Sequence, residues 1–188
     1  MRSSSPSRRP SRSPRGLPLI GLVALVALAS AFPLLAHAQE RTVLGRWQFV
    51  GGAAEVRAIS QAIDAALADF NPVMREIVAS QLRDTNRAYP EFSIAVEGDN
   101  IVSRINGRTL STPASGAARE VTTPEGRSAQ VTQRIQGSRL IQTLVNPQGT
   151  RTHTVSVGSD GNLTVEVRIE SSHLPRPIRY TLTYGRAA

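Results

Sequence analysis

The sequence contains no cysteine and no lysine, and aromatic residues make up only 4% of it. Without cysteine there are no disulfides, thiol chemistry or cysteine-bound metals, so packing and backbone pairing must hold the fold together. All 22 basic residues are arginines, a usage that fits a GC-rich genome. The sequence also lacks a glycine-rich phosphate loop, a nucleophile elbow and an inward carboxylate pair. We therefore predict a protein without catalytic activity, metal or cofactor.

The first 38 residues have the three parts of a secretory signal peptide. Residues 1–16 carry five arginines and no acidic residue, the apolar run 17–35 follows, and Ala36-His37-Ala38 forms an A-x-A cleavage site. The apolar run is near the length of a membrane-spanning helix. However, Pro18 and Pro33 flank it and the small residues follow, which favours cleavage over anchoring. We expect the mature chain to begin at about Gln39, in the periplasm or outside the cell.

Removal of this segment changes the charge of the protein. It carries five of the 22 basic residues and none of the 14 acidic ones, so the formal net charge falls from +8 to +3. A small charge spread along the chain lacks the basic stripe or cluster that is typical of nucleic-acid binding. The remaining 150 residues of the 188 suit one domain with a single core. We predict a monomer without a nucleic-acid partner.

A strand and two helices are predicted to begin the mature chain. Residues 43–50 have the composition of a strand, and Gly51-Gly52 ends it. Apolar residues then recur every three or four positions, which predicts a helical hairpin over 53–84. Asn71-Pro72 separates its two helices, with Asn as the cap and Pro in the first turn. The positions expected to face inward are Val56, Ile59, Ile63, Leu67 and Phe70 in the first helix, and Met74, Ile77, Val78 and Leu82 in the second.

After Tyr89-Pro90 the apolar residues follow a period of two to the end of the chain. Eight or nine short segments alternate in this way, and most are separated by turn signals such as Asn106-Gly107 and Gln136-Gly137. The pattern predicts a mainly β protein: an antiparallel up-and-down barrel of about nine or ten strands, with a helix-turn-helix lid after the first strand. That number of strands is sufficient to close the sheet and remove its edges.

This order of elements, with Gly45-x-Trp47 on the first strand, resembles the fatty-acid-binding proteins, and Gly45-x-Trp47 is similar to the first motif of lipocalins. Both families belong to the calycin barrels. The resemblance covers most of residues 41–186. It implies a ligand cavity under a helical lid, and it gives Trp47 a structural role at the closed end of the barrel. Fatty-acid-binding families often place an Arg-x-Tyr on the last strand to hold a carboxylate, whereas here Tyr180 directly follows Arg179, so the two point to opposite faces.

The strand phases place several polar side chains inside the predicted barrel. Val155 and Val157 put Arg151 and His153 on the inner face, while the phase of Gln142 is ambiguous because apolar residues occupy both faces of its strand. Burying a charged arginine inside a barrel costs free energy unless the guanidinium is paired or hydrated. One hypothesis is that this inner set anchors a polar or anionic head group. The alternative is that Arg151 lies in solvent and His153 is simply half-buried. The candidate ligand-binding residues are Gln133, Gln142, Arg151, His153, Tyr180 and Tyr184.

The leading hypothesis from the sequence is an exported, non-enzymatic barrel that holds a small lipophilic molecule. The alternative is an exported interaction or envelope accessory protein whose barrel is filled. A cavity of a few hundred cubic ångströms would favour the first, and a solid interior the second. Arginines on or near the hairpin add an expectation of transient membrane contact: Arg57, Arg75, Arg83 and Arg87.

Overall fold

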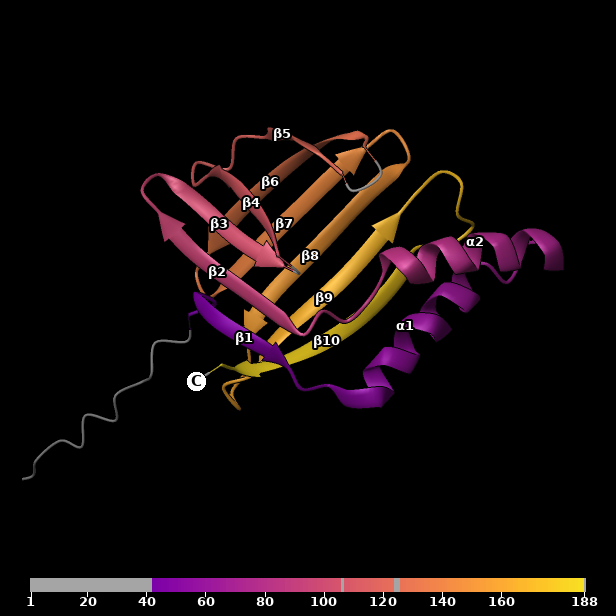
Figure 1. Ribbon diagram of the computed structural model, residues 1–188, viewed down its shortest axis with the longest axis horizontal. Coiled ribbons are helices and arrows are strands. Elements are labelled where there is room, and N and C mark those ends of the chain that lie inside the picture. Colours follow the sequence, from indigo (N-terminus) through magenta and orange to yellow (C-terminus); the bar gives the residue numbers. More distant parts are fainter. Residues whose placement is uncertain (1–41, 106, 124–125, 188) are drawn as a thin grey trace, which may run out of the picture. The chain divides into compact units, whose positions relative to one another are not determined.

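The computed structural model describes residues 42–105, 107–123 and 126–187, and the predicted signal peptide lies outside these residues. The described chain forms ten strands and two helices (Figure 1). In chain order they are β1 (Gly45–Phe49), α1 (Gly52–Ala66), α2 (Pro72–Thr85), β2 (Glu91–Glu97), β3 (Asn100–Ile105), β4 (Arg108–Pro113), β5 (Arg119–Thr122), β6 (Ser128–Gln136), β7 (Arg139–Asn146), β8 (Gly149–Val157), β9 (Leu163–Glu170) and β10 (Ile178–Arg186).

The strands form one antiparallel sheet in the order β4-β3-β2-β1-β10-β9-β8-β7-β6-β5. Strands that follow one another along the chain are neighbours from β1 to β4 and from β5 to β10, and the first strand, β1, pairs with the last, β10. Within the described residues, β4 and β5 are the sheet's two ends and share no ladder, so the barrel is nearly closed. The predicted up-and-down barrel with a helix pair after its first strand is confirmed.

Tight turns hold this register at the positions where the sequence has its turn signals. Gly98, between β2 and β3, and Gly137, between β6 and β7, both have φ of 58°. A residue with a side chain is disfavoured in this left-handed region, whereas glycine adopts it freely. The short hairpins therefore follow directly from the placement of glycine.

Trp47 and Gly45 fix one end of the barrel. Trp47 is 1% exposed, its Nε1–H donates to the Val43 carbonyl at 3.0 Å, and the guanidinium of Arg186 lies 4.6 Å from its ring centroid. Gly45 has φ of 133°, and a Cβ there would lie 3.0 Å from Arg186 Nη1. A side chain at position 45 would therefore disturb the residue that stacks on Trp47.

Helix α1 is anchored firmly to the barrel. Its inner face buries Ile59, Ile63 and Ala66. On the same helix, the Glu55 carboxylate accepts hydrogen bonds from the Thr183 backbone N–H at 2.7 Å and from the Thr183 hydroxyl at 2.6 Å. These two bonds join the first turn of α1 to β10.

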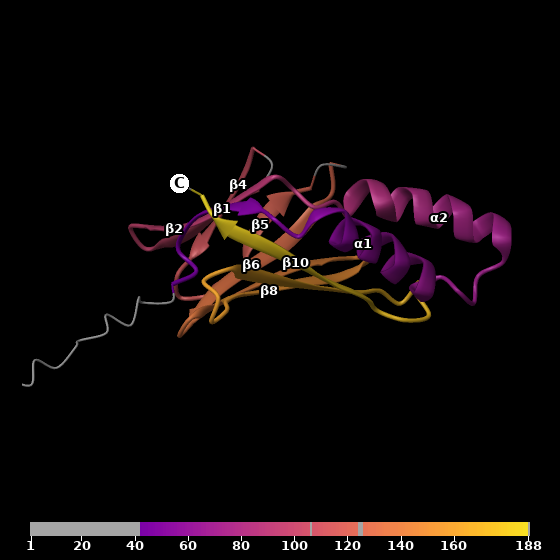
Figure 2. The same cartoon turned by 90° about the horizontal axis from the view of Figure 1, so that it is seen from below.

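Helix α2 is held more loosely, and Figure 2 shows it lying along α1 at one end of the barrel. It begins as predicted at Asn71, whose Oδ1 accepts from the Met74 N–H at 2.9 Å. The prediction that Met74 and Ile77 face inward is wrong, since they are 46% and 51% exposed, and Val56 of α1 is also exposed. The reason is that α2 contacts its surroundings along a narrow stripe around the buried Ala79. Neither helix of the described residues is long and apolar enough to cross a membrane.

Candidate functional site

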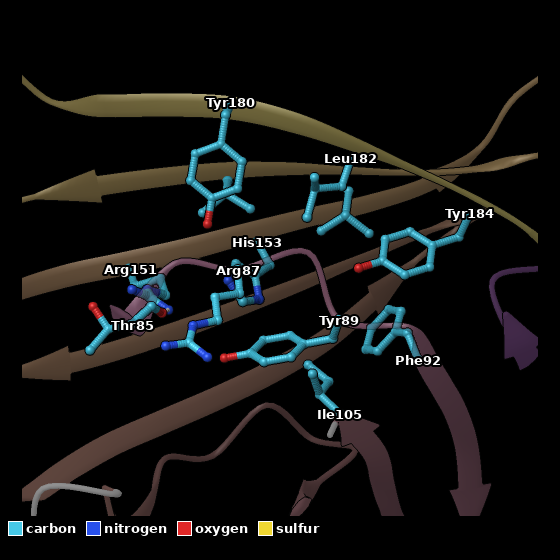
Figure 3. A pocket seen from close by; sticks show the side chains of 12 residues that line it. Thr85, Arg87, Tyr89, Phe92, Ile105, Arg151, His153, Tyr180, Leu182 and Tyr184 are labelled. Atoms are coloured by element: carbon cyan, nitrogen blue, oxygen red, sulfur yellow. Dashed lines mark hydrogen bonds between the residues drawn. The ribbon is translucent and has the colours of Figure 1, made fainter. Parts of the chain in front are cut away.

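An inner pocket lies inside the barrel, next to the segment that joins α2 to β2 (Figure 3). Its volume is about 40 Å³. That is room for water, whereas ligand pockets measure roughly 300–1,000 Å³. This pocket is therefore too small for an organic ligand in the conformation described. The pocket is lined by Thr85, Arg87, Tyr89, Phe92, Ile105, Arg151, His153, Val165, Val167, Tyr180, Leu182 and Tyr184.

Two donors at this pocket converge on one oxygen atom. Arg151 Nη2, from β8, donates to Asn86 Oδ1 at 2.9 Å, and the Tyr180 hydroxyl, from β10, donates to the same atom at 3.1 Å. Arg151 Nη1 also donates to the Thr85 carbonyl at 3.4 Å. The side chain of Arg151 is thus paired at the pocket and does not extend freely into solvent. Together the guanidinium and the hydroxyl form a binding position for an acceptor oxygen.

Asn86 reaches this position because it caps the C-terminus of α2. Its backbone leaves the helix with φ of −122° and ψ of 87°, and the residue is 3% exposed. The amide nitrogen donates to the Leu82 carbonyl at 2.7 Å and to the Thr85 hydroxyl at 3.3 Å. Since the helix end uses the nitrogen, the amide oxygen is directed at Arg151 and Tyr180.

A chain of polar side chains crosses the rest of the interior. His153 Nδ1 lies 3.0 Å from Gln142 Oε1, and Gln142 Nε2 donates to Gln133 Oε1 and to Ser103 Oγ, both at 3.0 Å. Gln133 Nε2 then donates to the Ile101 carbonyl at 3.0 Å. The chain joins β6, β7 and β8 to β3 on the opposite wall. The buried amides of Gln133 and Gln142 thus fill part of the barrel interior.

The ionisation of the pocket side chains follows from their burial. Burial, together with the charge of Arg151, lowers the pKa of His153 from its ordinary value to about 3. Burial also raises the pKa of Tyr180, against the opposing effect of Arg151, and raises the pKa of Tyr184 to about 12. At neutral pH the histidine is therefore neutral, and both tyrosines keep their hydroxyl protons.

A wider groove, of about 530 Å³, lies on the outer face of β8, β9 and β10. Its charged side chains are two arginines and two glutamates, and Arg168 is paired with Glu170 at 2.5 Å. The charges balance one another and do not converge on a common point. We therefore regard the inner pocket as the candidate site.

The structure divides the residues that the sequence singled out into two groups. Arg151, His153, Tyr180 and Tyr184 line the inner pocket. Gln133 and Gln142 also point inward, but their amides are used within the polar chain. Asn86, at the centre of the site, was not predicted. The residues of the linker, Arg87 and Tyr89, were also missed as pocket residues. Among the described residues, no group of three or more metal-ligating side chains could hold a metal ion.

No protein-family model matches the chain, and no curated protein matches it. Several solved structures match it in fold. A SAHS protein from Ramazzottius varieornatus has a TM-score of 0.53 at 11% identity, over 78% of this chain and 96% of its own. A single-site mutant of the fluorescent protein UnaG has a TM-score of 0.50 at 15% identity, over 77% and 96%. Fatty-acid-binding protein 1 of Echinococcus granulosus has a TM-score of 0.49 at 14% identity, over 77% and 97%.

These similarities at low identity concern the fold. The ten-stranded antiparallel barrel with its helix pair, together with the likeness to the SAHS protein and to UnaG, shows a calycin-type fold, which is the fold that the resemblance in the sequence implied.

Proposed function

We propose that this protein is a non-enzymatic binding protein that takes a small lipophilic ligand with an acceptor head group into its barrel. The observation that carries the proposal is the convergence of Arg151 and Tyr180 on a single oxygen atom at a pocket that Phe92, Ile105, Val165, Val167 and Leu182 also line. A guanidinium with a nearby hydroxyl suits a carboxylate or a similar anionic group. Small antiparallel barrels of this class have interiors of the right size for one small ligand.

The described conformation is, in this proposal, the closed state. The Asn86 oxygen occupies the position that a ligand oxygen would take, and the 40 Å³ pocket is too small for an acyl chain. Entry of a ligand requires displacement of Asn86 and of the end of α2. The packing of the helices favours this movement, because Ala79 is the one buried residue of α2, whereas α1 is tied to β10 through Glu55.

The proposal is tested by titrating the purified protein with a dansyl-labelled undecanoic acid and with the methyl ester of the same probe. We expect the acid to bind and the ester to bind more weakly. The substitution Arg151→Leu should weaken binding of the acid by roughly tenfold or more, which is the value of a hydrogen bond to a charged group.

Arg179 supplies the matched control. It precedes Tyr180 on β10 but points outward, so Arg179→Leu removes the same charge from the opposite face. The proposal predicts near wild-type binding for this variant. If the acid fails to bind, or if the two arginine variants weaken it equally, Arg151 does not hold a head group and the proposal is wrong.

The second candidate function is an interaction protein with a filled barrel, and the small volume of the inner pocket favours it. Native mass spectrometry of the protein as purified separates the two candidates. A co-purified lipid supports the binding protein. Absence of any lipid, together with no affinity for the acid probe, supports the interaction protein.

We further propose that the protein is exported by cleavage after Ala38. Secretion followed by intact-mass measurement should give a chain that begins at Gln39. Contact with membranes through the helix pair is also a proposal, supported by the exposure of Val73, Met74 and Ile77. Flotation with lipid vesicles tests it, and a variant with serine at these three positions should float less.

A further inference from the structure

The polar chain inside the barrel has a fixed direction. Gln133 Nε2 lies 3.0 Å from the Ile101 carbonyl and 3.4 Å from the Leu110 carbonyl, and main-chain carbonyls can only accept. The orientation of the Gln133 amide is therefore set, and its Oε1 must accept from Gln142 Nε2. The remaining atom of the Gln142 amide, Oε1, is then an acceptor as well.

This direction determines which nitrogen of His153 carries the proton. Gln142 Oε1 accepts, so the His153 Nδ1 that lies 3.0 Å from it must be the protonated nitrogen. The ring is neutral at ordinary pH because burial and Arg151 lower its pKa to about 3. His153 Nε2 is consequently a hydrogen-bond acceptor with an unshared electron pair.

This acceptor is open to the inner pocket. In the part of the chain that the structure describes, Arg75 Nε is the one buried side-chain nitrogen or oxygen without a partner. His153 Nε2 makes no hydrogen bond to the described residues either, and so it must be accessible. His153 lines the pocket, as Figure 3 shows.

The acceptor lies close to the proposed head-group position. Strand register places His153, Val167 and Tyr180 in one row across β8, β9 and β10. The Cα atoms of His153 and Tyr180 are therefore roughly 10 Å apart. Both side chains point into the barrel, so the distance between their polar ends is shorter. Arg151 lies two residues from His153 on the same face of β8. Val167 lies between His153 and Tyr180 in this row, and Arg151 begins the neighbouring row.

From this geometry we infer that the preferred ligand is a fatty acid with a hydroxyl group near its carboxyl end. The carboxylate replaces the Asn86 oxygen at Arg151 and Tyr180, and the hydroxyl donates to His153 Nε2. This inference rests on the proposed function. An unsubstituted chain covers Nε2 and removes its water without offering a donor, which carries a cost. We expect about a tenfold preference for the hydroxylated acid.

The test compares three acids of one chain length by isothermal titration calorimetry: decanoic acid, β-hydroxydecanoic acid and ω-hydroxydecanoic acid. The second carries its hydroxyl near the carboxylate, and the third carries the same group at the far end. The wild-type protein should bind the β-hydroxy acid about tenfold more tightly than the other two. Because this comparison varies only the ligand, it does not depend on any variant being folded.

A second arm uses His153→Phe, which removes the acceptor and keeps a ring. Its three affinities should become equal, while Thr152→Ala, on the outer face of the same strand, should keep the preference. Equal affinities in the wild type, or a preference that survives in H153F, would overturn the inference and leave the proposed function standing. If none of the acids binds the wild type, the proposed function itself fails, and the inference with it.

Discussion

The contact between Asn86 and the two donors leads to an uncommon expectation: a destabilising substitution should improve binding. Asn86→Ala removes the oxygen that accepts from Arg151 and Tyr180, and also the nitrogen that donates to the Leu82 carbonyl. Buried hydrogen bonds contribute about 1 kcal/mol each to stability. With these bonds lost, we expect the free energy of unfolding to fall by about 2–3 kcal/mol.

Affinity for a carboxylate should change in the opposite direction. In the wild type a ligand must break the two bonds to the Asn86 oxygen before its own oxygen can take the same position. At about 1 kcal/mol each, removal of this competition is worth about 2 kcal/mol, or roughly a thirtyfold lower Kd. Fluorescence titration with the dansyl-labelled acid measures the affinity, and urea unfolding of the same sample measures the stability.

Thr85→Ala is the matched control for this experiment. The Thr85 hydroxyl donates to the Gln81 and Leu82 carbonyls and accepts from Asn86 Nδ2, and its loss leaves the bond of Asn86 Nδ2 to Leu82 and the bonds of the Asn86 oxygen in place. This variant should lose some stability and gain little affinity. If N86A is less stable but binds the acid no better than the wild type, then Asn86 is only a helix cap and the competition argument is refuted.

Three further predictions concern stability. The pKa of His153 is lowered to about 3 in the folded chain, so between about pH 6 and pH 3 the unfolded chain binds a proton that the folded chain does not. The free energy of unfolding should therefore fall by about 1.4 kcal/mol for each pH unit of acidification in this range. Urea titrations at several pH values measure the slope, and H153F should reduce it. Gln133→Leu removes two buried hydrogen bonds, the one to the Ile101 carbonyl and the one from Gln142 Nε2, and should cost about 2–3 kcal/mol; a loss under about 0.5 kcal/mol in urea unfolding would contradict this. Trp47→Phe removes the Nε1–H bond to Val43 and should cost about 1–3 kcal/mol, measured by circular dichroism, whereas no change in midpoint would show that the indole is replaceable.

The barrel was predictable because the sequence features that determine it act within each hairpin. Alternation of apolar residues and the placement of glycine in the turns determine each hairpin, and hairpins added in sequence give the observed strand order. The same alternation placed Gln133 and Gln142 on the inner face. It could not show that the Gln133 amide is already bonded within the barrel, because its partner, the Ile101 carbonyl, lies 32 residues away in the chain. Inward polar residues were therefore interpreted as ligand contacts, although three of them, Gln133, Gln142 and His153, form a polar chain within the barrel.

The helix pair shows where periodicity misleads. Apolar spacing in α2 is genuine, but a helix that packs on one neighbour buries only a narrow stripe, so Met74 and Ile77 remain exposed. The sequence around Asp84-Thr85-Asn86 was interpreted only as a helix end. That interpretation is correct for the backbone, but the direction of the Asn86 side chain depends on where β8 and β10 lie relative to it.

The unusual spacing on the last strand can now be explained by the register of the sheet. In an Arg-x-Tyr arrangement that ends at Tyr180, the arginine would stand at position 178, where this chain has a fully buried isoleucine. Ile178 pairs with Ile169, and Ile169 pairs with Arg151, so the three residues form one row across the sheet. Arg151 thus starts from the same row, two strands away. A head group held by Arg151 and Tyr180 must therefore sit over β9, between its two donors, and not along β10. That position brings it next to Val167 and within reach of His153, which is why the hydroxylated acid and the plain acid should be distinguished at this site.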